Sequence, residues 1–175
     1  MAHGRRGTPQ RASQRQRRQS SFFNPRGDEA LPGLRQLRKW AKGTKVDVCD
    51  HGGRKGYAVI AAVRMRPGTT VAIYDMRVVD AARALPGDCR VRVGRMVGKP
   101  DDQSVGPPTD GVARLGQLLN EPATGEAANC ERTETKLYRH GTHRRAYFEL
   151  RTSKYVHKDE ELTWDYGESY GRRLY

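Results

Sequence analysis

Short apolar runs, separated by turns rich in Gly and Pro, most constrain how this chain can fold. The runs that alternate or are continuously apolar lie at 46–49, 57–63, 70–74, 77–79, 90–93 and 145–152. Period-two alternation between such turns is typical of β-strands. Few segments have helical spacing, and no repeat period is visible in the sequence. The pattern predicts a mostly-β fold of several short β-sheets with few short helices.

Positive charge is concentrated in the first part of the chain. The net charge is +13 over 175 residues; residues 1–45 hold 12 Lys and Arg against 2 acids, whereas the remainder holds 21 against 18. The first 24 residues carry six Arg and no acid, a composition that cannot bury enough apolar surface to fold. We therefore expect a disordered basic arm over 1–30, a short amphipathic helix or linker over 31–45, and one domain over 46–175.

The basic N-terminal residues indicate possible partners and a cellular location. An acid-free, Arg-rich segment attracts polyanions, so nucleic-acid or chromatin contact through residues 1–45 ranks first. A nuclear or organellar address ranks second, and an inert solubilising tail third. The sequence contains no apolar run of membrane-spanning length, so no membrane partner is expected. Three widely spaced cysteines, Cys49, Cys89 and Cys130, indicate a reducing, nuclear or otherwise intracellular compartment.

The segment Glu160–Gly167 reads EELTWDYG. Two carboxylates lead into a β-prone run that stops at Gly, which indicates a strand delivering Tyr166 to a turn where its hydroxyl faces a pocket. The alternative for Tyr166 is a core tyrosine of an ordinary strand. About forty residues upstream, Asn120-Glu121-Pro122 begins a second unusual stretch that closes with Asn129-Cys130; it could also be a plain turn.

Together these two segments resemble the paired signature of SET-domain protein-lysine methyltransferases. The resemblance extends to the glycine-containing run Lys55-Gly56-Tyr57-Ala58 and to the turn and strand of Arg66–Tyr74, and it spans roughly residues 46–170. Ala58 replaces an expected Gly, and Glu121-Pro122 replaces the usual His-Ser before a longer gap. The altered motif is similar to that of algal and viral SET-like sequences.

The resemblance implies a SET fold with a knot-like crossing of the C-terminal segments, braced by Asn129. It implies S-adenosylmethionine as the cofactor and Tyr166 as the catalytic residue. The residues carried over as cofactor-binding are Lys55, Gly56, Tyr57, Asn120, Glu121 and Tyr166. The residues carried over as substrate-channel walls are Trp164, Tyr147 and Tyr170. No zinc is expected, because the zinc-binding cysteine cluster that often follows a SET domain has no counterpart after Cys130.

The function expected from the resemblance is S-adenosylmethionine-dependent methylation of a protein lysine, with a histone as the leading substrate. The bulk of Trp164 favours addition of few methyl groups. One alternative is a catalytically weak SET-like module that binds chromatin or nucleic acid through its basic arm. A weaker one is a nucleic-acid-binding β-domain whose Tyr and Arg side chains stack on bases. His140 and His143 are expected to be exposed loop residues, since no Cys or acid nearby completes a metal site.

Overall fold

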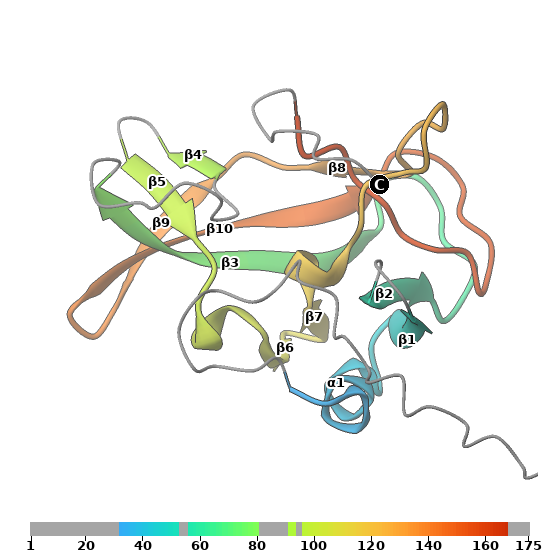
Figure 1. Ribbon diagram of the computed structural model, residues 1–175, viewed down its shortest axis with the longest axis horizontal. Coiled ribbons are helices and arrows are strands. Elements are labelled where there is room, and N and C mark those ends of the chain that lie inside the picture. Colours follow the sequence, from blue (N-terminus) through green and yellow to red (C-terminus); the bar gives the residue numbers. More distant parts are fainter. Residues whose placement is uncertain (1–31, 53–55, 81–90, 94–95, 168–175) are drawn as a thin grey trace, which may run out of the picture.

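The computed structural model describes residues 32–52, 56–80, 91–93 and 96–167. Strands dominate this part of the chain, which contains a single α-helix, and its sheets are not closed (Figure 1). The prediction of a mostly-β fold with few helices is therefore confirmed. The arm expected over 1–30 lies outside the described residues, as do Lys55, Cys89 and Tyr170.

Most of the elements along the chain are β-strands. They are α1 (Leu34–Ala41), β1 (Val46–Gly52), β2 (Gly56–Ala61), β3 (Thr70–Asp80), β4 (Val91–Val93), β5 (Met96–Lys99), the 3-10 helix η3 (Asp102–Ser104), β6 (Gly106–Thr109), β7 (Val112–Arg114), the 3-10 helix η4 (Gly116–Leu118), β8 (Cys130–Arg132), β9 (Lys136–His140) and β10 (His143–Thr152).

Two sheets organise the described residues. β1 and β2 form an antiparallel pair, and the larger sheet has the order β4-β5-β3-β10-β8, with β9 also beside β10 and β7 beside β3. The long strands β3 and β10 run antiparallel through the middle of the larger sheet (Figure 1). Their pairing runs from Arg77 opposite Arg145 to Thr70 opposite Arg151. This pair is the framework on which the shorter elements pack.

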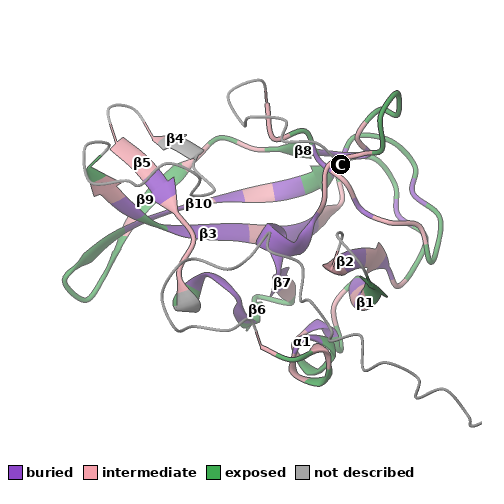
Figure 2. Ribbon diagram, in the orientation of Figure 1, coloured by how far each residue is buried: buried purple, intermediate pink, exposed green. Residues whose placement is uncertain are grey.

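Burial is concentrated along β3 and β10 (Figure 2). Phe148 and Leu150 of β10 and Met76 of β3 are fully buried. The ring of Tyr74 stacks on that of Phe148, with centroids 4.8 Å apart. Gly98 of β5 leaves room for Met76, because a Cβ at residue 98 would lie 1.9 Å from the Met76 sulfur. The apolar alternation read from the sequence is thus the inner face of this sheet.

A short helix packs against β1 and β6. Leu37 and Ala41 of α1 are buried, and Leu34 and Trp40 are partly buried against the core, which is the face that the sequence spacing indicates. Arg38 Nε donates to the Val48 carbonyl at 2.8 Å. The helix is therefore anchored to β1 by both apolar packing and a polar contact.

Several sequence expectations need correction. The runs at 70–74 and 77–79 are one strand, β3. The strand β9 was not predicted at all. The strand expected over 160–167 is instead an extended segment with isolated bridges. In each case pairing with a neighbouring segment, rather than local alternation, decides the structure.

That C-terminal segment crosses three others. The Leu162 amide donates to the Val59 carbonyl of β2 at 2.8 Å. One residue on, the Thr163 carbonyl accepts from the Cys130 amide at 2.9 Å, and the Trp164 amide donates to the Asn120 carbonyl at 3.1 Å. Residues 162–164 therefore lie between the chain at Asn120 and the chain at Cys130, which is the crossing that the SET resemblance implied.

Candidate active site

Tyr166 lies where this crossing ends. Its hydroxyl donates to the Leu119 carbonyl at 2.6 Å, and its ring lies 5.0 Å from that of Trp164. Leu119 follows η4 and is fully buried, so the acceptor is fixed by the core. The half-buried Tyr166 side chain is thus held at both its ring and its hydroxyl.

Asn120 joins the crossing to the β1–β2 pair. Its side-chain amide donates to Glu161 Oε1 at 2.9 Å and to the Tyr57 carbonyl at 3.4 Å. Glu161 Oε2 lies 3.5 Å from His51 Nε2. The structure therefore brings the predicted residues Tyr57, Asn120 and Tyr166 into one region. It adds Glu161 and His51, which sequence reasoning missed. The only signal for Glu161 was its place as the second acid before Leu162.

The start of β2 supplies backbone at this region. Gly56 has φ +63, a conformation that glycine adopts without a Cβ penalty. Ala58, which replaces the glycine of related motifs, is fully buried, so its methyl does not project into solvent. Glu121 is half-buried, and no described residue binds its carboxylate. Lys55 lies outside the described residues.

Asn129 holds the crossing together from the other side. Its side-chain amide donates to the Glu161 carbonyl at 2.8 Å and to Glu160 Oε1 at 3.1 Å. Its Oδ1 accepts from the Thr163 amide at 2.9 Å. The Asn129 side chain thus pairs with a backbone carbonyl and a backbone amide of residues 161–163, a segment that has isolated bridges but no regular strand ladder. This contact pattern is that of a bracing residue.

Trp164 belongs to an aromatic cluster beneath Tyr166. Its ring lies 5.7 Å from Tyr74 and 5.4 Å from Phe148. The indole is 5 % exposed, and its Nε1 is buried without a hydrogen-bond partner in the described chain. A buried donor without a partner is uncommon, and it marks this cluster as a place where a ligand group or a water could bind.

Tyr147 lies elsewhere. It neighbours Phe148 on β10, and successive strand residues face opposite sides of a sheet, so it points away from Trp164. Its ring contacts that of Tyr138 at 5.7 Å, and Lys136 Nζ lies 5.8 Å from its centroid. It lines a groove of about 760 Å³ with Trp40. The structure does not bring Tyr147 together with Tyr166, and Tyr170 lies outside the described residues.

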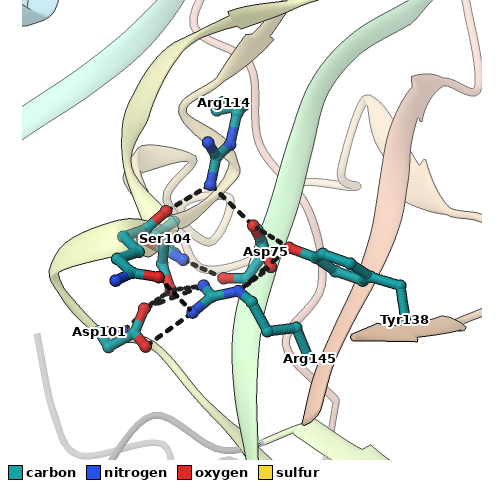
Figure 3. A network of polar contacts seen from close by, with 8 residues as sticks. Asp75, Asp101, Ser104, Arg114, Tyr138 and Arg145 are labelled. Carbon is teal, nitrogen blue, oxygen red and sulfur yellow. Dashed lines mark hydrogen bonds and ion pairs between the residues drawn. The ribbon is translucent and has the colours of Figure 1, made fainter. Parts of the chain in front are cut away.

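A buried polar network underlies this second face (Figure 3). Arg145 is 1 % exposed; it donates to Asp101 at 2.9 Å and to Asp75 at 3.1 Å. Asp75 also accepts from Arg114 and from the Tyr138 hydroxyl, both at 2.8 Å. The network joins β3, β7, β9 and β10 to the chain before η3. A buried guanidinium requires such carboxylates.

The network shifts the ionisation of its members. Burial alone would raise the pKa of Asp101, but hydrogen bonds from Arg145 and Ser104 outweigh burial and lower it. Burial, and then the hydrogen bond to Asp75, raise the pKa of Tyr138. The lowered pKa of Asp101 favours an ionised carboxylate beside the Arg145 guanidinium, and the raised pKa of Tyr138 favours a neutral hydroxyl that donates to Asp75. The network is a structural one and does not touch Tyr166.

Cys130 is a buried thiol. Burial, and then the neighbouring Glu160, raise its pKa to about 12, so it is protonated at neutral pH. His140 and His143 are exposed, as expected, but they lie at the end of β9 and the start of β10 rather than in a loop. Within the described ranges, no group of three His, Cys, Asp or Glu residues is arranged to hold a metal ion.

Oxygen acceptors along this region suit a cationic ligand. They are the Leu119 carbonyl, which accepts from Tyr166, and the Tyr57 carbonyl and Glu161 carboxylate, which accept from Asn120. Because the Tyr166 hydroxyl donates its proton to Leu119, it presents an acceptor oxygen to any further neighbour. S-adenosylmethionine, which the resemblance implies, carries a positive sulfonium. An acceptor-rich site of this kind suits it.

Comparison with solved structures gives the same architecture. A candidate histone methyltransferase of Plasmodium falciparum matches with a TM-score of 0.50 and 14 % identity, over 73 % of this chain and 96 % of that one. The methyltransferase domain of human PR domain-containing protein 2 matches with a TM-score of 0.50 and 16 % identity, over 83 % and 97 %. No protein-family model and no curated protein matches the sequence.

The chain has the fold of SET domains, and the resemblance read from its motifs is confirmed at that level. The likeness is one of overall fold rather than of residue identity, which is 14 % and 16 %. In the described ranges, no helix is long and apolar enough to cross a membrane.

Proposed function

We propose that this chain is an S-adenosylmethionine-dependent protein-lysine N-methyltransferase, with a histone as the leading substrate. The observation that carries the proposal is the Tyr166 hydroxyl, fixed by the Leu119 carbonyl at 2.6 Å beside the buried Trp164 indole. It lies at the crossing of a SET fold. The names of the two structural neighbours, both of which refer to methyltransferases, support the reaction class by analogy.

Bound S-adenosylmethionine would supply an electrophilic methyl group on a positively charged sulfur. Tyr57, Asn120 and Tyr166 would hold it, with Asn120 oriented by Glu161 through the 2.9 Å contact. The Tyr166 oxygen would face the positive charge, an arrangement that favours catalysis when the oxygen is fixed in advance. Positioning is the larger part of such a transfer.

The substrate amine must be neutral to attack. A free lysine has a pKa of about 10.4, and an apolar wall lowers it by desolvating the ammonium. Trp164, Tyr74 and Phe148 are at most 5 % exposed, so they would provide such a wall and exclude water. As the lysine nitrogen bonds to the methyl carbon, the carbon–sulfur bond would break, its electron pair would stay on sulfur, and neutral S-adenosylhomocysteine would leave. The N-methylated ammonium that results would then release a proton to solvent.

The first test is methyl transfer from radiolabelled S-adenosylmethionine to core histones and whole-cell protein. Tyr166→Phe should lower the rate by about 100-fold, the loss typical for one fixed electrostatic contact. Tyr155→Phe is the matched control, since this tyrosine is 54 % exposed and contacts Arg64 rather than the site. Its rate should equal that of wild type.

Two outcomes would contradict the proposal. If calorimetry detects no binding of S-adenosylmethionine to the folded chain, S-adenosylmethionine is not its cofactor. If Tyr166→Phe is as active as wild type, the Tyr166 hydroxyl has no role in catalysis.

The number of methyl groups added is a finer part of the proposal. Trp164 is the largest side chain that could narrow a lysine channel beside Tyr166, so we expect monomethylated product. Trp164→Phe should widen the channel and yield dimethylated product, measured by mass spectrometry of the modified peptide. An unchanged product distribution would show that Trp164 does not line the channel.

A further inference from the structure

The hairpin formed by β9 and β10 carries an unusual concentration of positive charge. Its two strands are joined by Gly141-Thr142, and Figure 1 shows its turn projecting beyond the rest of the sheet. In its register Arg139 lies directly opposite Arg144, and His140 lies opposite His143. All four residues are exposed.

Such pairing is unfavourable for an isolated ribbon. Like charges directly opposite on an antiparallel pair destabilise it. No described residue offers a carboxylate to either arginine; the one polar contact of Arg144 is with Met96 Sδ at 3.8 Å. Lys136 adds a further cation on the same ribbon. The hairpin therefore keeps a repulsive arrangement that a bound anion would relieve.

The other arginines of β10 are paired with acids, unlike Arg144. Arg145, the next residue, is buried between two aspartates. Arg151, at the other end of β10, pairs with Glu149 at 2.7 Å. Arginines of β10 are thus neutralised by acids except at Arg144 on the projecting tip, where the partner is another arginine.

We infer that the β9–β10 hairpin is a binding site for double-stranded DNA, with Arg139 and Arg144 contacting phosphates. A two-stranded β-ribbon fits the major groove of B-DNA, which is about 12 Å wide, and cations on a ribbon can then reach the phosphates beside the groove. The site lies apart from Tyr166 and does not depend on methyl transfer. It is also distinct from the basic residues at the start of the chain.

The test measures duplex DNA binding by the full chain at several salt concentrations. Each phosphate contact contributes about 0.9 to the slope of log K against log salt. Arg139→Gln combined with Arg144→Gln should lower that slope by about 1.8, and it should weaken binding roughly 60-fold at 0.1 M salt. The arm is present in both proteins, so its contribution cancels.

The matched control combines Arg64→Gln with Arg66→Gln. These arginines are exposed, belong to the β2–β3 connection and make no ion pair with any described residue. They lie toward the opposite end of β3 from the hairpin. The control carries the same loss of charge and should retain most of the wild-type slope. Because the hairpin variant removes a repulsive pair, its thermal unfolding midpoint should be at or above that of wild type.

Three results would overturn the inference. One is a hairpin variant whose salt slope equals that of wild type. Another is a control variant that loses as much affinity as the hairpin variant, which would mean that only total charge matters. The third is competition by polyglutamate that displaces the duplex as well as unlabelled DNA does, which would identify an acidic protein surface as the partner instead.

Discussion

The bracing role of Asn129 makes the sharpest prediction about the fold. Asn129→Ala removes the acceptor of the Thr163 amide and the donors to Glu161 and Glu160. The side chain is 4 % exposed, and each buried polar group left unpaired costs about 1–3 kcal/mol. Two backbone groups lose their partner, and because Thr163 is half-buried we expect a total loss of about 3 kcal/mol.

That loss is a large fraction of the roughly 5–15 kcal/mol that stabilises a domain. Urea unfolding, followed by tryptophan fluorescence, measures it. With a urea dependence of about 1–3 kcal/mol per molar, the midpoint should fall by roughly 1–3 M. Thr124→Ala, at an exposed position of the same connection, should change the free energy of unfolding by less than about 0.5 kcal/mol.

Asn129→Asp separates hydrogen bonding from volume. The aspartate keeps an acceptor for the Thr163 amide but directs a negative oxygen at the Glu160 carboxylate and the Glu161 carbonyl, where Asn129 now donates. It should be at least as destabilising as alanine. If Asn129→Asp unfolds with wild-type stability while Asn129→Ala does not, packing rather than hydrogen bonding holds the crossing, and the reasoning is refuted.

Three further predictions concern single positions. A Cβ in Gly116→Ala would lie 2.7 Å from backbone atoms of β3, so the variant should lose about 1–3 kcal/mol in urea unfolding; wild-type stability would show that η4 can move freely. Asp159 has φ +66, a backbone conformation that costs less for glycine than for aspartate. Asp159→Gly should therefore raise the free energy of unfolding by up to about 1 kcal/mol. A lower urea midpoint than that of wild type would contradict this. Burial raises the pKa of Asp101, but hydrogen bonds from Arg145 and Ser104 outweigh burial, and the pKa is lowered overall. The ionised Asp101 carboxylate therefore stabilises the fold at neutral pH. This contribution is lost as the pH falls below about 4. Asp101→Asn should flatten the acid limb of a stability–pH curve, and an unchanged limb would exclude the effect.

Much of the strand framework could be read from the sequence because it depends on local apolar patterns. β1 and much of β10 bury alternate residues, whereas β2 and β3 are nearly continuous apolar runs with consecutive buried residues. β9 was missed because it is an edge strand with five residues, Lys136–His140, none of them buried. Without a buried face, an edge strand leaves no apolar pattern to detect.

Within the site, the sequence could indicate Tyr166 and Asn120 through their motifs but could not indicate what they contact. The Asn120–Glu161 contact joins residues 41 apart in sequence, and the pairing of His51 with Glu161 joins residues still farther apart. The Asp75–Arg145 pair was missed for the same reason, since its two residues are 70 apart in sequence. Side-chain contacts across such separations follow from the register of the sheets rather than from local pattern.

The same C-terminal segment both holds the described fold together and forms part of the candidate site. A loss of activity in a variant can therefore come from lost stability or from a changed site. Asn120 and Thr163 both contribute to the crossing and lie next to the proposed cofactor site, so substitutions there would lower stability and activity together. Tyr166→Phe differs, because the ring can keep its packing on Trp164 while only the hydrogen bond to Leu119 is lost. Loss of one such bond costs about 1 kcal/mol of stability, whereas the expected 100-fold loss of rate corresponds to about 2.7 kcal/mol in the transition state. A rate loss larger than the stability loss can therefore be assigned to the hydroxyl itself.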